Sequence, residues 1–289
     1  MGYEIAVCVK QVPDTENLTG EAMKEDGTVN RAALPAIVNP EDLNALEMAL
    51  ALKDEHGGRV TVVSMGPPKA ADALRECLFR GADRAVLLTD VRFAASDTLA
   101  TSYALSCAIR KLGEPDLVLC GRQAIDGDTA QIGPQLAEKL GLPQFTYVEE
   151  VRDVGPDGIV VKRGLEGGYE VVRGPLPALL TVTSSANDPR PPSAKRLMRC
   201  KKARAACELG EDGRDAAVAG LRERGLLIEH WGVDEIEADE EACGGSGSPT
   251  RVKNIDSVRL HSEEHKVVEP TTEGLTGLVE ELMNEHIFD

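Results

Sequence analysis

Residues suited to ligand binding are concentrated in one segment, from Gly121 to Pro134, which reads GRQAIDGDTAQIGP. Its glycines permit a close approach of the backbone, and the free amides of a helix that starts there suit a phosphate or pyrophosphate. Asp126 and Asp128 would repel phosphate, so their expected roles are to cap the helix, accept ribose hydroxyls or shape the turn. The spacing alone leaves two interpretations open, a nucleotide loop and a structural connection between a strand and a helix.

Other candidate motifs give weaker signals. Neither G-x-G-x-x-G nor G-x-x-x-x-G-K-[ST] occurs, so a nucleotide would be held by another scheme. In the segment Ser64–Pro68, Met65 either packs on an adenine ring or fills a turn. The run His261–His265 fits H-x-x-E-H, but its polar surroundings indicate solvated charge, and no metal is expected. The five histidines lie outside the loops that follow the predicted strands, so any chemistry would belong to a cofactor.

Alternating strands and helices must position the Gly121–Pro134 segment. Short β-branched runs predict buried strands, and amphipathic patterns closed by glycine predict the helices between them. The predicted strands are Ile5–Val9, Arg59–Ser64, Ala85–Leu88 and Asp116–Leu119. The predicted helices run from the Asn39-Pro40 start to Gly57 and then over Lys69–Arg80, Asp97–Lys111 and Thr129–Leu140. This α/β alternation predicts a Rossmann-type, mostly parallel sheet with helices on both faces and ligands at the carboxyl ends of its strands.

The sequence changes character near residue 185. A hairpin over Gly158–Arg163 and Tyr169–Val172 and a closing strand over Ala178–Thr183 complete a predicted nucleotide-binding domain of residues 1–185. Residues 186–289 are rich in proline and charge, with short helices expected near Asp215–Arg224 and Leu275–Met283. A segment with so few apolar runs is not expected to fold alone. We therefore expect residues 186–289 to be an extension that packs on a partner subunit.

The overall composition limits the partners. Lys+Arg 32 against Asp+Glu 49 gives a formal net charge of -17, which repels nucleic acid and anionic membrane surfaces. The seven cysteines contain no C-x-x-C pair, which argues against a zinc cage or a disulfide frame. Because no signal-peptide pattern and no apolar run of membrane-spanning length occurs, a cytoplasmic protein without a membrane span is expected.

Taken together, these motifs resemble the β subunit of electron transfer flavoprotein over essentially the whole chain. The resemblance rests on VCVKQVPDT from Val7, NPED from Asn39, SMGP from Ser64, GADR from Gly81 and, above all, GRQAIDGD from Gly121. It implies an adenine nucleotide α-hydrolase-like fold, an α subunit that carries one FAD, and a second adenine nucleotide on this chain. That nucleotide is AMP in ordinary members and a second FAD in the electron-bifurcating branch.

The sequence is similar to the bifurcating branch in three places. DGDTAQIGP from Asp126 replaces the D-D-D-x-N-Q-T-G of AMP binders, KQVPD from Lys10 replaces their K-R-V-x-D, and Phe93–Ser102 is similar to a loop that approaches the second flavin. The resemblance implies that this FAD accepts a hydride from NADH. Its electrons then divide between ferredoxin or flavodoxin and, through the α-subunit FAD, an acyl-CoA dehydrogenase.

Carried over position by position, the resemblance implies a set of nucleotide contacts on this chain. These are Cys8, Asn39, Asp42, Met65, Asp97, Thr98, Thr101, Gly121, Arg122, Gln123, Ala124, Ile125, Asp126, Gly127, Asp128, Thr129, Ala130, Gln131 and Ile132. Backbone at Cys8 and Met65 is expected beside the adenine, and amides around Thr129–Ile132 are expected to face phosphate. Asn187–Cys200 corresponds to the loop that recognises the acyl-CoA dehydrogenase, with Ala194 where mitochondrial members carry an exposed leucine.

Two alternatives stay open at the level of sequence. The first keeps the family but binds structural AMP, which leaves a carrier with a single flavin. The second is a stand-alone adenine-nucleotide sensor with the same α/β core and no redox role. The long extension after residue 185 argues against the sensor, and the Asp126–Pro134 pattern argues against the AMP form.

Overall fold

The computed structural model describes residues 2–14, 35–250 and 267–285. The chain divides into two compact units, Met1–Arg251 and Val252–Asp289, and the first contains the sheet and the candidate site. Of the second unit, the structure describes one helix, α7 (Thr272–Asn284), within the segment expected to be helical. Among the described residues, no helix is both long and apolar enough to cross a membrane.

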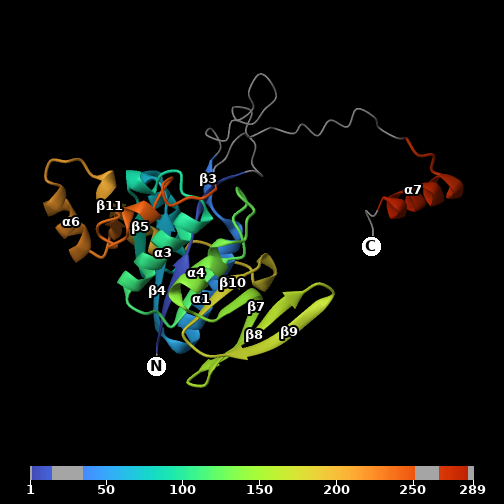
Figure 1. Cartoon of the computed structure of the whole chain (residues 1–289), viewed down its shortest axis with the longest axis horizontal. Coiled ribbons are helices and arrows are strands. Elements are labelled where there is room, and N and C mark those ends of the chain that lie inside the picture. The colour runs from blue at the N-terminus through green and yellow to red at the C-terminus, as the bar shows by residue number, and fades with distance from the viewer. Residues whose placement is uncertain (1, 15–34, 251–266, 286–289) are drawn as a thin grey trace. The chain divides into compact units, whose positions relative to one another are not determined.

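Within the described residues, ten strands form one twisted sheet at the centre of the first unit (Figure 1). Their order across the sheet is β11-β12-β5-β4-β1-β6-β10-β7-β8-β9, and only β7, β8 and β9 pair in antiparallel fashion. In chain order they are β1 (Tyr3–Cys8), β4 (Gly58–Met65), β5 (Arg84–Leu88), β6 (Leu117–Gly121), β7 (Gln144–Gly155), β8 (Gly158–Leu165), β9 (Gly168–Gly174), β10 (Ala178–Val182), β11 (Arg204–Ala205) and β12 (Leu227–Trp231). The predicted mostly parallel sheet is confirmed.

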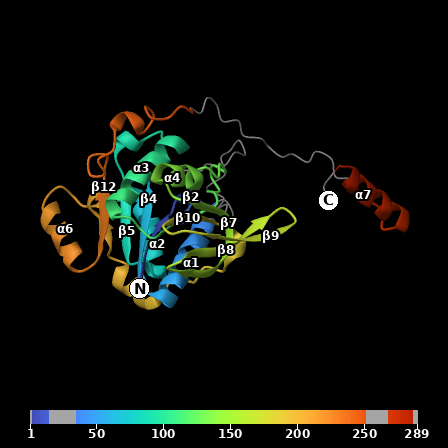
Figure 2. The ribbon, with the colours of Figure 1, turned by 60° about the horizontal axis from the view of Figure 1, so that its bottom comes forward.

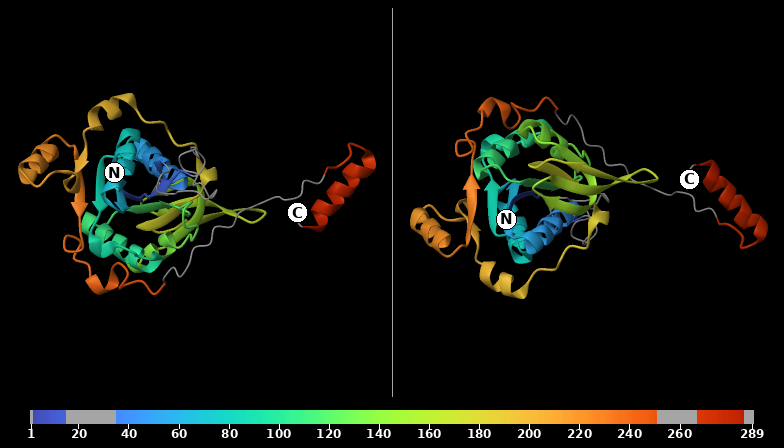
Figure 3. Two further views of the ribbon diagram at one scale, coloured as in Figure 1. Left: turned by 90° about the horizontal axis from the view of Figure 1, so that it is seen from above. Right: turned by 90° about the horizontal axis from the view of Figure 1, so that it is seen from below.

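Helices cover both faces of the sheet, as predicted (Figure 3). Helices α1 (Pro40–His56) and α2 (Ala71–Arg80) pack on one face over β-branched residues such as Val60 and Val62. Helices α3 (Thr98–Leu112) and α4 (Ile132–Leu140) pack on the other over Cys8, Cys120 and Leu179. Strand residues buried on both faces are what a parallel sheet between two helical layers requires.

Shorter elements complete the first unit. A small antiparallel pair, β2 (Gln11–Pro13) with β3 (Ala36–Val38), lies beside the main sheet. The remaining elements are α5 (Ala194–Cys200), α6 (Arg214–Glu223) and the 3-10 turns η3 (Pro68–Ala70), η4 (Val91–Phe93), η5 (Ser184–Ala186), η6 (Ala206–Glu208) and η7 (Glu240–Ala242). The predicted Asp215–Arg224 helix and the predicted hairpin, seen as β8 and β9 in Figure 2, are confirmed.

Helix α4 begins later than the sequence pattern predicts. Its first residue is Ile132, whereas a start at Thr129 was expected. The backbone of Asp128 (φ 47°) and Ala130 (φ 53°) is left-handed, and such residues cannot continue a right-handed helix. Residues 129–131 therefore belong to the loop that leaves β6 rather than to the helix.

The first unit runs past the expected boundary at residue 185. Strand β12 pairs in parallel with β5, through His230 opposite Leu87 and Trp231 opposite Leu88, and β11 pairs with β12. Trp231, Val233 and Ile236 also join the apolar cluster on the α3 side of the sheet. Residues between 186 and 250 thus complete the core of this unit, because they cover a strand edge that would otherwise be open.

Candidate functional site

The carboxyl ends of the central strands meet at one edge of the sheet. Cys8, the last residue of β1, lies in register with Val63 of β4 and Cys120 of β6. The chain leaves this edge through loops tied to neighbouring strands: the Val9 amide donates to the Val63 carbonyl (2.8 Å), and the Arg122 amide donates to the Val182 carbonyl (2.9 Å). The loops predicted to form the site therefore start side by side.

The start of α1 holds the first half of the Gly121–Pro134 segment. Asn39 is the N-cap of α1 by position, but its side chain makes no capping hydrogen bond. Its amide group donates to the Gln123 carbonyl (2.9 Å), and its carbonyl oxygen accepts from the Ile125 amide (3.1 Å). Glu41 accepts from the Gln123 amide (3.0 Å) and pairs with Arg122 (3.1 Å). Residues 121–125 are thus fixed by polar contacts with one helix end.

Asp42 joins two strand-end loops from a buried position. One carboxyl oxygen accepts from the Lys10 amide (2.8 Å) after β1, and the other accepts from the Gly121 amide (3.0 Å) at the end of β6. Asp42 is only 6% exposed. Burial raises the pKa of Asp42 to about 7, against the lowering effect of these hydrogen bonds. Asp42 therefore links the loop after β1 to the loop after β6 from a buried position.

Two glycines of this segment play different parts. A β-carbon at Gly121 would lie 2.5 Å from Asp42 Oδ1 and 2.7 Å from the Glu41 carbonyl carbon, so the strand end and the helix start pack without room for a side chain. A β-carbon at Gly127 would meet no atom within 4 Å. The close approach at Gly121 serves protein packing, whereas the Gly127 backbone stays accessible from outside.

The acids of the exposed turn have partners inside the protein. Lys10 pairs with Asp126 (2.7 Å), and the Gln123 amide group donates to Asp128 (3.1 Å). These contacts offset the repulsion that two carboxylates would exert on a phosphate group. Residues 126–129 are exposed, so their backbone can be reached by a ligand. The shaping role expected of both acids is consistent with this arrangement.

The start of α3 approaches the same loop from the other side of the sheet. Asp97 caps α3, accepting from the amides of Leu99 (2.9 Å) and Ala100 (3.1 Å). The Thr98 hydroxyl donates to the Gln131 side chain (2.7 Å). Thr101 lies one turn into the helix, with its amide on the Asp97 carbonyl (3.0 Å). Thr98 and Gln131 therefore connect two predicted parts of the site directly.

Cys8 at the end of β1 and Ser64 and Met65 at the end of β4 contribute different chemical groups to this edge of the sheet. Burial raises the pKa of the Cys8 thiol to about 12, so it stays protonated and contributes backbone and sulfur bulk rather than a thiolate. Met65 packs against the apolar cluster that contains Cys8. Among the described residues, the fully buried Ser64 hydroxyl has no hydrogen-bond partner.

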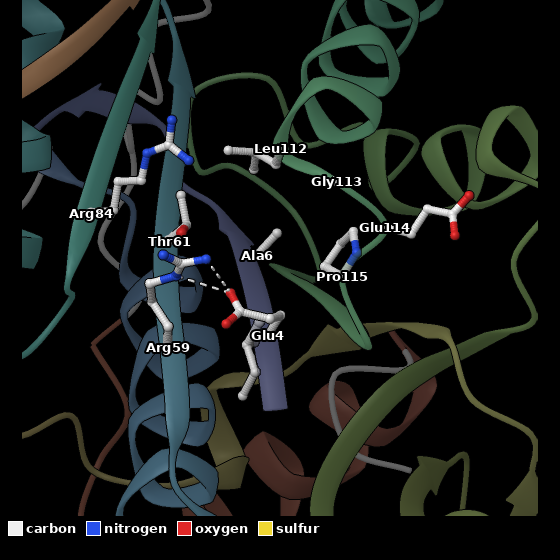
Figure 4. Close-up of a pocket in the computed structure, with 10 residues that line it drawn as sticks. Glu4, Ala6, Arg59, Thr61, Arg84, Leu112, Gly113, Glu114 and Pro115 are labelled. Atoms are coloured by element: carbon white, nitrogen blue, oxygen red, sulfur yellow. Dashed lines mark hydrogen bonds and ion pairs between the residues drawn. The ribbon is translucent and has the colours of Figure 1, made fainter. Parts of the chain in front are cut away.

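A cavity of about 190 Å³ lies at the opposite edge of the sheet, at the amino ends of the strands (Figure 4). It is lined by Glu4, Arg59, Thr61, Arg84 and the turn before β6. Arg59 is paired with Glu4 (2.9 Å), and Arg84 stacks on the Trp231 ring (5.6 Å to the centroid). Its place away from the strand-end loops separates this cavity from the candidate nucleotide site.

No cluster of three His, Cys, Asp or Glu side chains within the described ranges is arranged to hold a metal ion. The H-x-x-E-H run, His261–His265, lies outside the described residues. Thr15, the last residue of the VCVKQVPDT motif, also lies outside them.

Sequence reasoning located the loops but missed several of the contacts that hold them together. In the sequence, Lys10 and Glu41 stand out only as members of the KQVPD and NPED motifs, yet both bind the loop. Glu41 is itself buried, at 7% exposure. An acidic pair in the first turn of a largely buried helix was the available signal for Glu41 and Asp42. Ser248, which contacts Asp97, gave no signal because 151 positions separate the two residues.

Fold and site together define an α/β protein whose strand-end loops are arranged as in nucleotide-binding folds. A family model described as the electron transfer flavoprotein domain matches residues 26–206. The chain belongs to the electron transfer flavoprotein family.

Curated relatives agree with this assignment over nearly the full length. The chain is 43% identical to the electron transfer flavoprotein subunit beta of Clostridium acetobutylicum, over 98% of each chain. It is 42% identical to the caffeyl-CoA reductase-Etf complex subunit CarD of Acetobacterium woodii, over 98% of this chain and 99% of the relative. It is 44% identical to protein FixA of Azorhizobium caulinodans, over 92% and 88%. The chain functions as an electron transfer flavoprotein β subunit, which implies an α-subunit partner.

Proposed function

We propose that this chain is the β subunit of an electron-bifurcating flavoprotein and binds FAD at the edge formed by Cys8, Met65 and residues 121–132. When bound, this FAD would take a hydride from NADH and supply electrons to ferredoxin or flavodoxin and, through the α-subunit FAD, to an acyl-CoA dehydrogenase. The observation that carries the proposal is the loop around Gly127, which combines an accessible backbone with internally paired acids.

The residues present fit the ADP portion of such a cofactor. Residues 126–129 offer exposed backbone, and Lys10 offsets the charge of Asp126. The neutral Cys8 and the apolar Met65 suit the edge of an adenine ring. These groups bind and orient, and none of them has to donate or accept a proton.

Thr98 supports FAD in preference to AMP. Its contact with Gln131 brings the start of α3 to the end of the loop, so a ligand longer than AMP would meet polar groups beyond the phosphate region. The DGDTAQIGP sequence, which differs from the AMP-type pattern, includes Gln131. AMP would leave the α3 side of the site without a role.

One relative supports an acyl-CoA partner. CarD carries the name of a caffeyl-CoA reductase-Etf complex subunit, and its likeness to this chain extends over nearly its full length. We therefore propose an acyl-CoA dehydrogenase or reductase as the high-potential acceptor. The exposed Met198 and Leu197 of α5 lie within the Asn187–Cys200 segment proposed to recognise it.

We propose that the region after residue 185 also contacts the α subunit. Helix α7 exposes Leu275, Val279 and Met283, which recur every four residues and so share one face. An apolar stripe of this kind on a short helix is stabilised chiefly by packing against another surface. Because proteins of this family pair with an α subunit, we propose the α subunit as the surface that covers this face of α7.

The proposal is tested by following electrons through the αβ complex. NADH is the donor, ferredoxin the low-potential acceptor, and an acyl-CoA dehydrogenase with its unsaturated acyl-CoA the high-potential acceptor. Ferredoxin reduction is expected only when the acyl-CoA route is also open, with equal numbers of electrons in the two routes. Delivery of all electrons to the acyl-CoA route, with ferredoxin left oxidised, would contradict bifurcation.

A further inference from the structure

The last described part of the first unit, Gly244–Thr250, packs directly on the start of α3. The Gly245 amide donates to the Ala94 carbonyl (3.0 Å), and the Thr250 amide donates to the Asp97 carboxylate (3.0 Å). Gly244 adopts a left-handed backbone (φ 56°), and a β-carbon there would lie 2.2 Å from the Arg92 carbonyl oxygen. This segment therefore fits against residues 92–97 with little space to spare.

Ser248 is the central contact between the two segments. Its hydroxyl accepts from the Asp97 amide (2.8 Å) and donates to the Gly244 carbonyl (2.7 Å). The residue is 5% exposed, so its hydroxyl has no easy replacement by water. One side chain thus shapes the 244–248 turn and fixes the residue that caps α3.

The capping carboxylate is held by the same group of contacts. Partial burial raises the pKa of Asp97, but hydrogen bonds from three backbone amides outweigh this effect and keep the pKa below its ordinary value. Two of those amides belong to α3, and the third is that of Thr250. The ionised Asp97 therefore joins the helix start to the end of the first unit.

These contacts continue to the proposed cofactor loop. Thr98 follows Asp97 and donates to Gln131 (2.7 Å), and Gln135 donates to the Thr98 hydroxyl (3.4 Å). Ser102 in turn donates to Gln135 (3.1 Å). Polar contacts, joined by the peptide bond between Asp97 and Thr98, thus run from Ser248 through the start of α3 to the start of α4.

We propose that Ser248 is a positioning residue that holds the start of α3 against the cofactor loop and so favours FAD over AMP. This inference rests on the proposed function, because it assigns the α3 side of the site to the part of FAD that AMP lacks. We call Gly244–Thr250 the clasp. Ser248 touches neither ligand, and its effect passes through Asp97 and Thr98.

The test compares Ser248→Ala with Ser246→Ala in the complete αβ complex. Ser246 is exposed and lies two residues away in the same turn, so it is a matched control. Each complex is equilibrated with graded FAD at fixed AMP, and the bound nucleotides are released and counted. FAD beyond one per complex measures binding to this chain.

Ser248→Ala is expected to weaken this FAD binding about tenfold, the effect of losing one hydrogen bond to a buried group, and to leave AMP binding unchanged. Ser246→Ala should match the wild type. Equal weakening of FAD and AMP in Ser248→Ala would indicate general loosening of the fold and would overturn the selective role. Unchanged FAD binding would overturn it as well.

Hydrogen exchange separates this inference from the proposed function. The Leu99 and Ala100 amides, both held by Asp97, are expected to exchange about tenfold faster in Ser248→Ala than in the wild type, whichever nucleotide is bound. Exchange of these two amides at the wild-type rate would overturn the role that we assign to the clasp. A wild-type complex that retains one FAD and one AMP at every FAD concentration would instead contradict the proposal that this chain binds FAD.

Discussion

At the scale of single residues, the polar groups of the NPED run act on the protein's own loops. Asn39 and Glu41 hold Gln123, and Asp42 holds the amides of Lys10 and Gly121. The loop that they fix forms the surface proposed to face the nucleotide. Changes to the NPED run are therefore expected to act on stability and loop order first, and on nucleotide affinity as a consequence.

Gly121→Ala is expected to destabilise the folded chain by about 1 to 3 kcal/mol, because the new methyl group overpacks the contact with Asp42. Gly127→Ala is the matched control, since its methyl group would meet no atom within 4 Å. Its effect on stability should stay within about 0.5 kcal/mol. Chemical denaturation measures both. Equal midpoints for the two variants would show that Gly121 is not packed as described.

Asp42→Asn tests the buried carboxyl through pH. The pKa of Asp42 is raised from 3.8 to about 7, so the folded chain keeps a proton that the unfolded chain releases near pH 4. The stability this group contributes is therefore complete below about pH 4 and is lost as pH rises to about 7. The wild type should lose unfolding free energy relative to Asp42→Asn over this window. A difference that is flat or grows with pH would contradict the burial argument.

The types of residue at the site were predictable, but their partners were not. The Gly121–Pro134 segment follows a strand and contains glycines and acids, which local reasoning recognises. That Asp126 pairs with Lys10, 116 positions away, depends on which strands become neighbours in the sheet. The late start of α4 depends on the left-handed backbone of Asp128 and Ala130. Neither residue type by itself predicts that conformation in a sequence.

At the scale of elements, the strands and helices with strong local signals were predicted, and three strands of the main sheet, β7, β11 and β12, were missed. Helix α1 has Pro40 in its first turn and Gly57 at its end, and both signals are local. Strand β7 shifts register between Val148 and Glu150 and again between Val151 and Asp153, which breaks the alternation that reveals a strand. Strand β12 contains Glu229 and His230 and becomes a strand by pairing with β5, far away in sequence.

This pairing predicts the result of shortening the chain. A chain that ends at residue 185 would leave the β5 edge open and remove Trp231 from the apolar cluster, so we expect it to aggregate. A chain that ends at residue 251 keeps both and is expected to stay folded. Each is produced together with the α subunit and compared by soluble yield and circular dichroism. A soluble, native-like chain of residues 1–185 would contradict the role assigned to β12.

At the scale of the whole molecule, charge and surface are arranged for protein partners. The formal net charge of -17 disfavours nucleic acid, while apolar side chains stay exposed on α5 and α7. Strand β7 carries the exposed Tyr147, and strand β9 carries the exposed Tyr169 and Val171. A β subunit that works only beside an α subunit and an electron acceptor would need such surfaces.

The most direct measurement is the nucleotide content of the purified αβ complex. Because the loop around Gly127 and the start of α3 are assigned to FAD, acid release followed by chromatography is expected to give two FAD molecules and no AMP per complex. One FAD and one AMP would contradict the account and leave a carrier with a single flavin.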